Sequence, residues 1–274
     1  MRNFSCAFVF IFLSIFLSCV EKHEHYSADL TVEPETIESG KTAVLSFQVK
    51  NPKGEKVTDL EIVHEKPMHL FLVSEDLAQY FHEHPQKQAD GSYQLPFTFP
   101  NGGKFKIFID FKPKDDEQTV ESFDIEVAGE LLKKQDLVPD EKFEKSIESI
   151  FVRMKPESKL LKQQDTTFIF EVFDAETKAP VSDLQNYLGE KAHFVIIRKG
   201  LGRFVHVHPM SSEKMMDNSN TKGTKMRETM PTKNGDVSKI AAMAKFPNSG
   251  IYKIFAQFKR NDEVITVPFV FEVK

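Results

Sequence analysis

Residues 68–85, MHLFLVSEDLAQYFHEHP, decide the fold. The first six residues are almost all apolar and predict a strand, and Ser74 to Gln79 form a plausible loop after it. The His-Glu-His run that follows ends at Pro85, which cannot donate a hydrogen bond to a strand ladder. The segment therefore predicts a β-hairpin that carries histidines on both strands.

The hairpin pattern occurs twice in the chain. It returns as AHFVIIRKGLGRFVHVHP at residues 192–209, displaced by 124 residues, and the block from Phe99 to Lys112 returns displaced by 147 residues as Phe246 to Lys259. The difference of 23 residues (147 − 124) is an insertion in the second copy. Self-similarity at this spacing indicates two copies of one domain. The residues that recur in the first block are Val57, Asp59, Leu60, His69, Leu77, His82, His84 and Pro85, matched by Val181, Asp183, Leu184, His193, Leu201, His206, His208 and Pro209.

Both copies consist of short alternating segments that predict strands. Apolar and polar residues alternate from Ala43 to Val49 and from Thr167 to Phe173, and Asn51 to Gly54 is a turn signal. No long stretch has helical periodicity. The pattern predicts an all-β protein with two tandem antiparallel sandwiches of the immunoglobulin or cupredoxin kind. Further alternating segments are Lys104–Phe111, Ser122–Val127, Ile251–Phe258 and Val267–Val273.

These patterns divide the chain into five parts. We expect a signal peptide at 1–18, a lipidated tether at 19–26, a first sandwich at 27–128, a linker at 129–147 and a second sandwich at 148–274. The second sandwich carries the insertion at about 210–235. The linker is rich in Lys, Glu and Asp, and we expect one or two helical turns around Glu141 to Ile147.

The first residues predict export. Arg2 precedes an apolar run from Phe4 to Leu17, which is too short to cross a bilayer comfortably, and Cys19 closes it. This end resembles the lipobox of bacterial lipoproteins, although Phe16 and Leu17 stand where that motif has leucine and a small residue. We expect acylation of Cys19 and a membrane-anchored lipoprotein on the periplasmic face or cell surface. An ordinary signal peptide and an uncleaved anchor are the alternatives.

Composition excludes several classes of site. The two cysteines are Cys6, inside the signal, and Cys19. The folded part therefore has no disulfide, thiol nucleophile, zinc-thiolate finger, iron–sulfur cluster or blue copper site. The formal net charge of -5 argues against nucleic acid as a partner. No nucleophile motif, phosphate loop or zinc-protease helix is present, and the sequence predicts that the chain is not an enzyme.

Six of the nine histidines lie in the repeated pattern His-x12-His-x-His-Pro. His82 and His84 are two residues apart, so on a strand they point to the same face. If paired residue numbers add up to 153, His69 lies opposite His84, and if they add up to 151 it lies opposite His82. Either register brings all three rings together, whereas the register between them places His69 opposite Glu83 and separates the cluster. The same holds for His193, His206 and His208.

Three neutral imidazoles on one face make a site for Cu(II) or Zn(II). The alternative is that the histidines fill the sheet with satisfied polar ends. The repeat favours a metal, because neighbouring residues differ between the copies, as Phe71 and Val195 do, while the histidines are retained. We expect one ion in each domain, and we expect His84→Ala and His208→Ala to damage separate sites.

Methionines favour copper over zinc. Met68 precedes the first histidine, and Met210, Met215 and Met216 lie in the insertion. Thioether sulfur suits Cu(I). We treat these four as candidate additional ligands and favour Cu(II) or Cu(I), with Zn(II) as the alternative. Leu188 replaces His64 in the second copy, and we interpret His64 as a structural or surface residue.

The stretch from Met68 to Pro85, followed by Asp90-Gly-Ser-Tyr and Phe99-Pro-Asn-Gly-Gly-Lys-Phe-Lys-Ile-Phe-Ile-Asp-Phe, resembles YtkA-like and copper-resistance sandwich domains of exported bacterial proteins. The resemblance covers about residues 57–112 and is weaker in the second copy, where Gln257 replaces Asp110. It implies an exported sandwich linked with heavy-metal handling.

Together these features predict a module that buffers or delivers copper outside the cytoplasm, or confers resistance to it. The alternative is a surface lipoprotein that binds another protein, with structural histidines. A third reading is an accessory domain pair for a metal efflux system. The expected partners are the metal ion, the membrane through the lipid anchor, and efflux components, with no nucleic acid.

Overall fold

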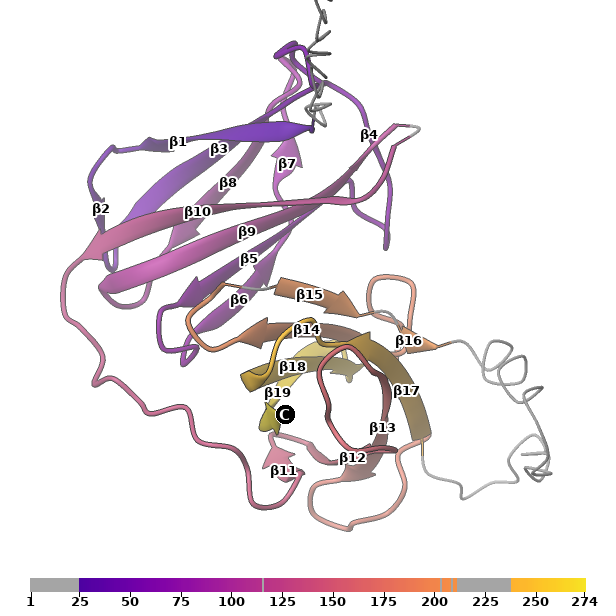
Figure 1. The fold of residues 1–274 in the computed structure, drawn as a ribbon. Helices are drawn as coiled ribbons and strands as arrows, with labels where there is room; N and C mark the ends of the chain where they lie inside the picture. Colours follow the sequence, from indigo (N-terminus) through magenta and orange to yellow (C-terminus); the bar gives the residue numbers. More distant parts are fainter. Residues whose placement is uncertain (1–24, 115, 203, 208, 211–237) are drawn as a thin grey trace, which may run out of the picture.

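The computed structural model describes residues 25–114, 116–202, 204–207, 209–210 and 238–274. Within these ranges every regular element is a β-strand, and the strands form four sheets stacked as layers (Figure 1). The prediction of two tandem sandwiches is confirmed. The same ranges contain no helix with the length and apolarity needed to cross a bilayer.

The first sandwich has an outer and an inner sheet, the inner one being the sheet that faces the second sandwich. The outer sheet has the order β1 (Ser27–Glu33), β3 (Thr42–Lys50), β8 (Tyr93–Thr98) and β7 (Gln86–Lys87). The inner sheet has the order β2 (Ile37–Glu38), β10 (Thr119–Ala128), β9 (Gly103–Pro113), β5 (Met68–Ser74) and β6 (Tyr80–Glu83), with β4 (Leu60–Glu61) beside β9. Neighbours pair antiparallel except β2 and β10.

The second sandwich repeats this arrangement. Its inner sheet has the order β15 (Phe204–Val207), β14 (His193–Arg198), β18 (Gly250–Arg260) and β19 (Glu263–Val273). Its outer sheet has the order β11 (Glu144–Ile147), β12 (Ile150–Pro156), β13 (Asp165–Asp174), β17 (Ser238–Lys245) and β16 (Pro209–Met210).

The predicted helical turn around Glu141 to Ile147 is wrong. Residues 144–147 form β11, which pairs with β12 from Ile147↔Ile150 to Glu144↔Arg153. The second sandwich therefore begins inside the predicted linker. In this strand the exposed Glu144 and Ser146 alternate with the half-buried Lys145 and Ile147, as on an edge strand with one wet face.

The two inner sheets also pack against each other. On β5, Leu70 and Leu72 enter the core of the first sandwich, while Phe71 and Val73 join a third apolar cluster between the sandwiches. This is why the strand is buried at all seven positions and its sequence is nearly continuous apolar residues. The interface cluster consists of Phe71, Val73, Leu77 and Phe108 from the first sandwich and Val195, Ile197, Leu201 and Phe255 from the second.

The contact between the sandwiches is reciprocal. Tyr80 stacks on Phe255 with ring centroids 4.0 Å apart, and Phe204 stacks on Phe108 at 5.1 Å. Phe204 is the repeat counterpart of Tyr80, and Phe255 is that of Phe108. Matching patches of the two copies thus meet, as in the isologous interface of a symmetric dimer. Figure 1 shows β5 and β6 beside β14 and β15.

Candidate metal centre

Three histidines of the first domain lie together on the face that meets the second domain. The β5–β6 pairing runs from Leu70↔Glu83 to Val73↔Tyr80, so paired numbers add up to 153 and His69 faces His84. This is one of the two registers that the sequence allowed. Each of His69, His82 and His84 offers a nitrogen, and these nitrogens lie within 4.8 Å of one another. The group could hold a metal ion.

The carbonyl of Val63 orients His69. His69 is 1% exposed, and its Nε2 lies 2.9 Å from the Val63 oxygen. A carbonyl only accepts, so Nε2 carries the hydrogen and donates it. In the neutral ring the lone pair is then on Nδ1. Val63 is held in place by a tight turn in which it pairs with Lys66.

Gln257 of the second domain orients His82. Its Oε1 lies 2.8 Å from His82 Nδ1, while its Nε2 donates to Thr266 Oγ1 at 3.3 Å. The amide oxygen accepts, so His82 Nδ1 carries the hydrogen and its lone pair is on Nε2. Metal-bound histidines in proteins are held in the same way, with the other ring nitrogen donating to an oxygen.

The two oriented lone pairs point at the same place. His69 Nδ1 and His82 Nε2 are 3.1 Å apart. Two lone pairs at this distance need a shared proton or a metal ion between them. Two nitrogens that each lie about 2.0–2.1 Å from one ion, at angles from square-planar to tetrahedral, are about 2.8–3.4 Å apart. The observed spacing fits a metal ion as the bridging cation.

His84 supplies a third nitrogen. Its Nε2 is buried and has no hydrogen-bond partner among the described residues. Burial, with smaller electrostatic contributions from His69 and Lys66, lowers the pKa of His84 to about 3. The ring is therefore neutral at physiological pH, and its buried lone pair is available to an ion.

The shifted pKa of His84 predicts a pH-dependent stability of the metal-free protein. An unfolded chain has this pKa near 6.5, so between about pH 6.5 and pH 3 it binds a proton that the folded protein does not. Stability should then fall as the pH drops through this window. In His84→Gln this proton uptake on unfolding is absent, so the free energy of unfolding should depend less steeply on pH within the window. The urea midpoint, measured against pH with chelator present, reports the difference. Identical slopes in the two proteins would contradict the assignment.

The second domain brings its own histidine to the first triad. His193 is 3% exposed, and its ring lies 4.6 Å from that of His82 and 5.9 Å from that of His69. We expected two separate sites, but His193 adjoins the first one. The β14–β15 pairing repeats the register of the first hairpin, with Val195 opposite His206. The side chain of His206 and the whole of His208 lie outside the described residues.

Two residues that the sequence did not mark as part of a metal site also lie here. His64, with φ +50°, has its ring 6.2 Å from both His69 and His193. Asp110 is fully buried, faces His69 across the β5–β9 pair and accepts a 2.6 Å hydrogen bond from Gln118 Nε2. A buried carboxylate near the centre offsets the charge of a bound cation. The sequence offered one sign of this role, because Asp110 is the one charged residue in the otherwise apolar Phe-Ile-Asp-Phe segment.

The structure excludes Met68 as a ligand and places the backbone of Met210, whose side chain lies outside the described part. Met68 is fully buried in the core of the first sandwich, on the opposite face of β5 from His69, and is not a ligand of this site. Met210 lies in β16, which belongs to the outer sheet of the second sandwich. Met215, Met216 and Cys19 lie outside the described residues.

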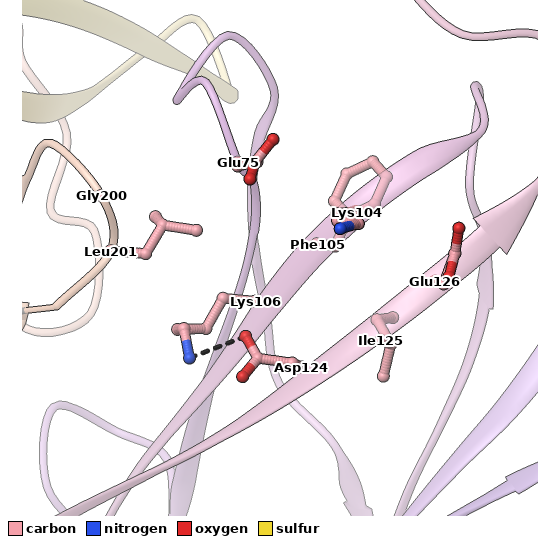
Figure 2. A pocket seen from close by; sticks show the side chains of 9 residues that line it. All are labelled: Glu75, Lys104, Phe105, Lys106, Asp124, Ile125, Glu126, Gly200 and Leu201. Carbon is pink, nitrogen blue, oxygen red and sulfur yellow. Dashed lines mark ion pairs between the residues drawn. The ribbon is translucent and has the colours of Figure 1, made fainter.

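A separate pocket opens at another part of the domain interface. It has a volume of about 530 Å³ and is lined by Glu75, Lys104 and Glu126 from the first domain and by Gly200 and Leu201 from the second, among others. Figure 2 shows the ion pair between Lys106 and Asp124, which lie opposite each other on the neighbouring strands β9 and β10. The Lys106 Nζ to Asp124 Oδ1 distance is 2.7 Å. No histidine lines the pocket, so it is not part of the metal centre.

Comparison with known protein families identifies the repeat. The model of one family, described as Domain of unknown function (DUF8832), matches twice, at residues 21–129 and 145–274. The chain belongs to this family. Each match covers one sandwich, and the second begins within β11. None of the curated proteins compared matches the chain.

Solved structures resemble the chain only weakly. They include the Escherichia coli adhesin FdeC, at 12% identity and a TM-score of 0.28 over 90% of this chain and 64% of that one. The Yersinia pseudotuberculosis adhesin InvE has 12% identity and a TM-score of 0.27 over 91% and 61%. The chain thus spans less than two thirds of these two structures, and scores this low carry no argument about function.

Proposed function

We propose that this protein is an extracytoplasmic lipoprotein that binds a metal ion at His69, His82 and His84, and that it buffers or delivers the metal or confers resistance to it. The observation that carries the proposal is the pair of oriented nitrogens of His69 and His82, 3.1 Å apart with their lone pairs facing. The resemblance of the first copy to copper-resistance domains supports it.

Copper is the favoured ion. Cu(II) stands above Zn(II) in the affinity order of divalent metals for a given set of ligands, and both accept imidazole. Met68 gives copper no support, since it faces away from the centre. The preference therefore rests on affinity order and on the family resemblance, and zinc is the alternative.

A metal titration tests the proposal. The full chain, purified in detergent and stripped of metal, should bind Cu(II) or Zn(II) at the triad when titrated in competition with a chromophoric chelator. His84→Ala should weaken this binding, whereas His25→Ala, which removes an exposed histidine outside the cluster, should not. Binding should also weaken as the pH falls, because a protonated imidazole has no lone pair to give, and the low pKa of His84 moves protonation of that ring well below pH 6.5. If the wild type, His84→Ala and His25→Ala bind the metal equally well, the triad is not the binding site.

The export part of the proposal rests on the apolar run before Cys19. Cys19→Ser should release the protein from membranes or leave a precursor that keeps residues 1–18. Fractionation and intact mass of the cellular protein would measure this. If membrane partition and mass are both unchanged, Cys19 is not the anchor.

Protein binding by the sandwich surfaces is the competing function. The observation that favours it is that two of the histidines already have hydrogen-bond partners within the protein. His82 bonds Gln257 across the domain interface, and His69 bonds Val63 within its own domain. On this account the cluster only joins the two domains. It predicts no stoichiometric metal uptake in the titration above.

A further inference from the structure

The metal centre has a wall built by the second domain. Gln257, which is 4% exposed, and His193 are paired neighbours on β18 and β14. Gln257 bonds His82, and the His193 ring lies tilted at 32° against the His82 ring. Tyr187 approaches both histidine rings edge-on, at 6.2 Å from His82 and 6.4 Å from His193. Ligands from one domain are thus oriented and covered by residues of the other.

We propose that the second domain completes the metal centre, with Gln257 as a positioning residue for His82, so that the ion is held tightly only when the two domains are docked. This inference rests on the proposed metal-binding function. It assigns the duplication a role: one copy supplies ligands, and the other supplies the group that orients them and the rings that exclude water.

The sequence difference between the copies fits this division. Gln257 stands where the first copy has Asp110. Asp110 is held by Gln118 of its own domain, whereas Gln257 is anchored by Thr266 and turns its oxygen across the interface. A neutral acceptor there fixes the His82 tautomer without placing a second buried carboxylate in the interface.

Docking and metal binding should therefore strengthen each other. An ion on His82 Nε2 withdraws electrons from the ring and makes its Nδ1 hydrogen a better donor to Gln257. Any ligand that binds only the docked form stabilises that form by mass action. Adding metal should then slow proteolysis of the connecting segment, residues 129–143, in which Leu137 packs on the interface cluster and the Gln135 N–H donates to Asp76.

Three variants of the full chain test the inference. Gln257→Leu should weaken Zn(II) and Cu(II) binding by about 10–100-fold, the usual cost of losing a partner that orients a ligand. Gln257→Glu keeps an accepting oxygen and should restore affinity to near the wild-type value. Lys253→Met is the matched control, because Lys253 Nζ also bonds across the interface, to Leu77 O at 2.7 Å, but touches no histidine.

The readouts are metal affinity, the Cu(II) electron paramagnetic resonance spectrum and the metal-dependent protection of residues 129–143 from protease. The inference is supported if Gln257→Leu alone loses affinity, alters the copper spectrum and loses protection. It is overturned if Gln257→Leu binds like the wild type, or if Lys253→Met loses as much affinity as Gln257→Leu. If the wild-type chain takes up no metal, the proposed function itself is rejected. If the wild type binds metal and Gln257→Leu binds it equally well, only the role of the second domain is rejected.

Discussion

His82→Leu is expected to lower metal affinity by more than about 100-fold, beyond the loss caused by removing an orienting partner. His82 is the proposed ligand that hydrogen-bonds a side chain of the second domain: its Nε2 faces His69, its Nδ1 bonds Gln257, and its ring stacks on Phe71 at 4.3 Å. Leucine keeps much of the packing on Phe71 but removes both nitrogens. Competition titration with Zn(II) and Cu(II) measures the loss.

Tyr80→Phe is the matched control for His82→Leu. Tyr80 lies on the same strand and face, and its hydroxyl is buried with no hydrogen-bond partner among the described residues. Removing the hydroxyl should leave metal affinity unchanged. An affinity for His82→Leu equal to that of Tyr80→Phe would show that His82 is not a ligand.

Phe71→Ala is expected to destabilise the protein by about 3–5 kcal/mol, the usual cost of truncating a fully buried phenylalanine. Phe71 is completely buried between the sandwiches, where it contacts Phe204 at 5.0 Å and His82. The cavity would open where the two domains meet, so docking should weaken along with global stability. Urea unfolding gives the free energy, and protease sensitivity of residues 129–143 reports docking.

Ile62→Ala gives the comparison for Phe71→Ala. Ile62 is 72% exposed, and its truncation should change stability by no more than about 0.5 kcal/mol. If Phe71→Ala costs no more than Ile62→Ala, the two sandwiches do not pack through this face in solution.

Much of the first hairpin followed from the sequence, because the period of two in a strand and the position of Pro85 restrict the register. Two registers were allowed, and the pairing Leu70↔Glu83 selects one of them. The repeat displaced by 124 residues then predicted the same register in the second hairpin, as the pairing Phe194↔Val207 shows.

The approach of the two domains could not be predicted in the same way. Histidine spacing constrains neighbours within one hairpin, but it carries no information about which sheet faces cover each other. One clue was present: Phe71 and Val73 are apolar on the face that carries His69, so this face needed a cover. Without the fold, nothing in the sequence linked Gln257 to His82, 175 residues apart.

The measurement that tests the central claim most directly is anomalous X-ray scattering from crystals of the protein grown with Zn(II) or Cu(II). The account predicts an anomalous peak at the domain interface, about 2.0–2.1 Å from one nitrogen each of His69, His82 and His84, with Gln257 still bonded to His82 Nδ1. Bound metal at surface positions only, with an unchanged proton-bridged contact between His69 and His82, would contradict it.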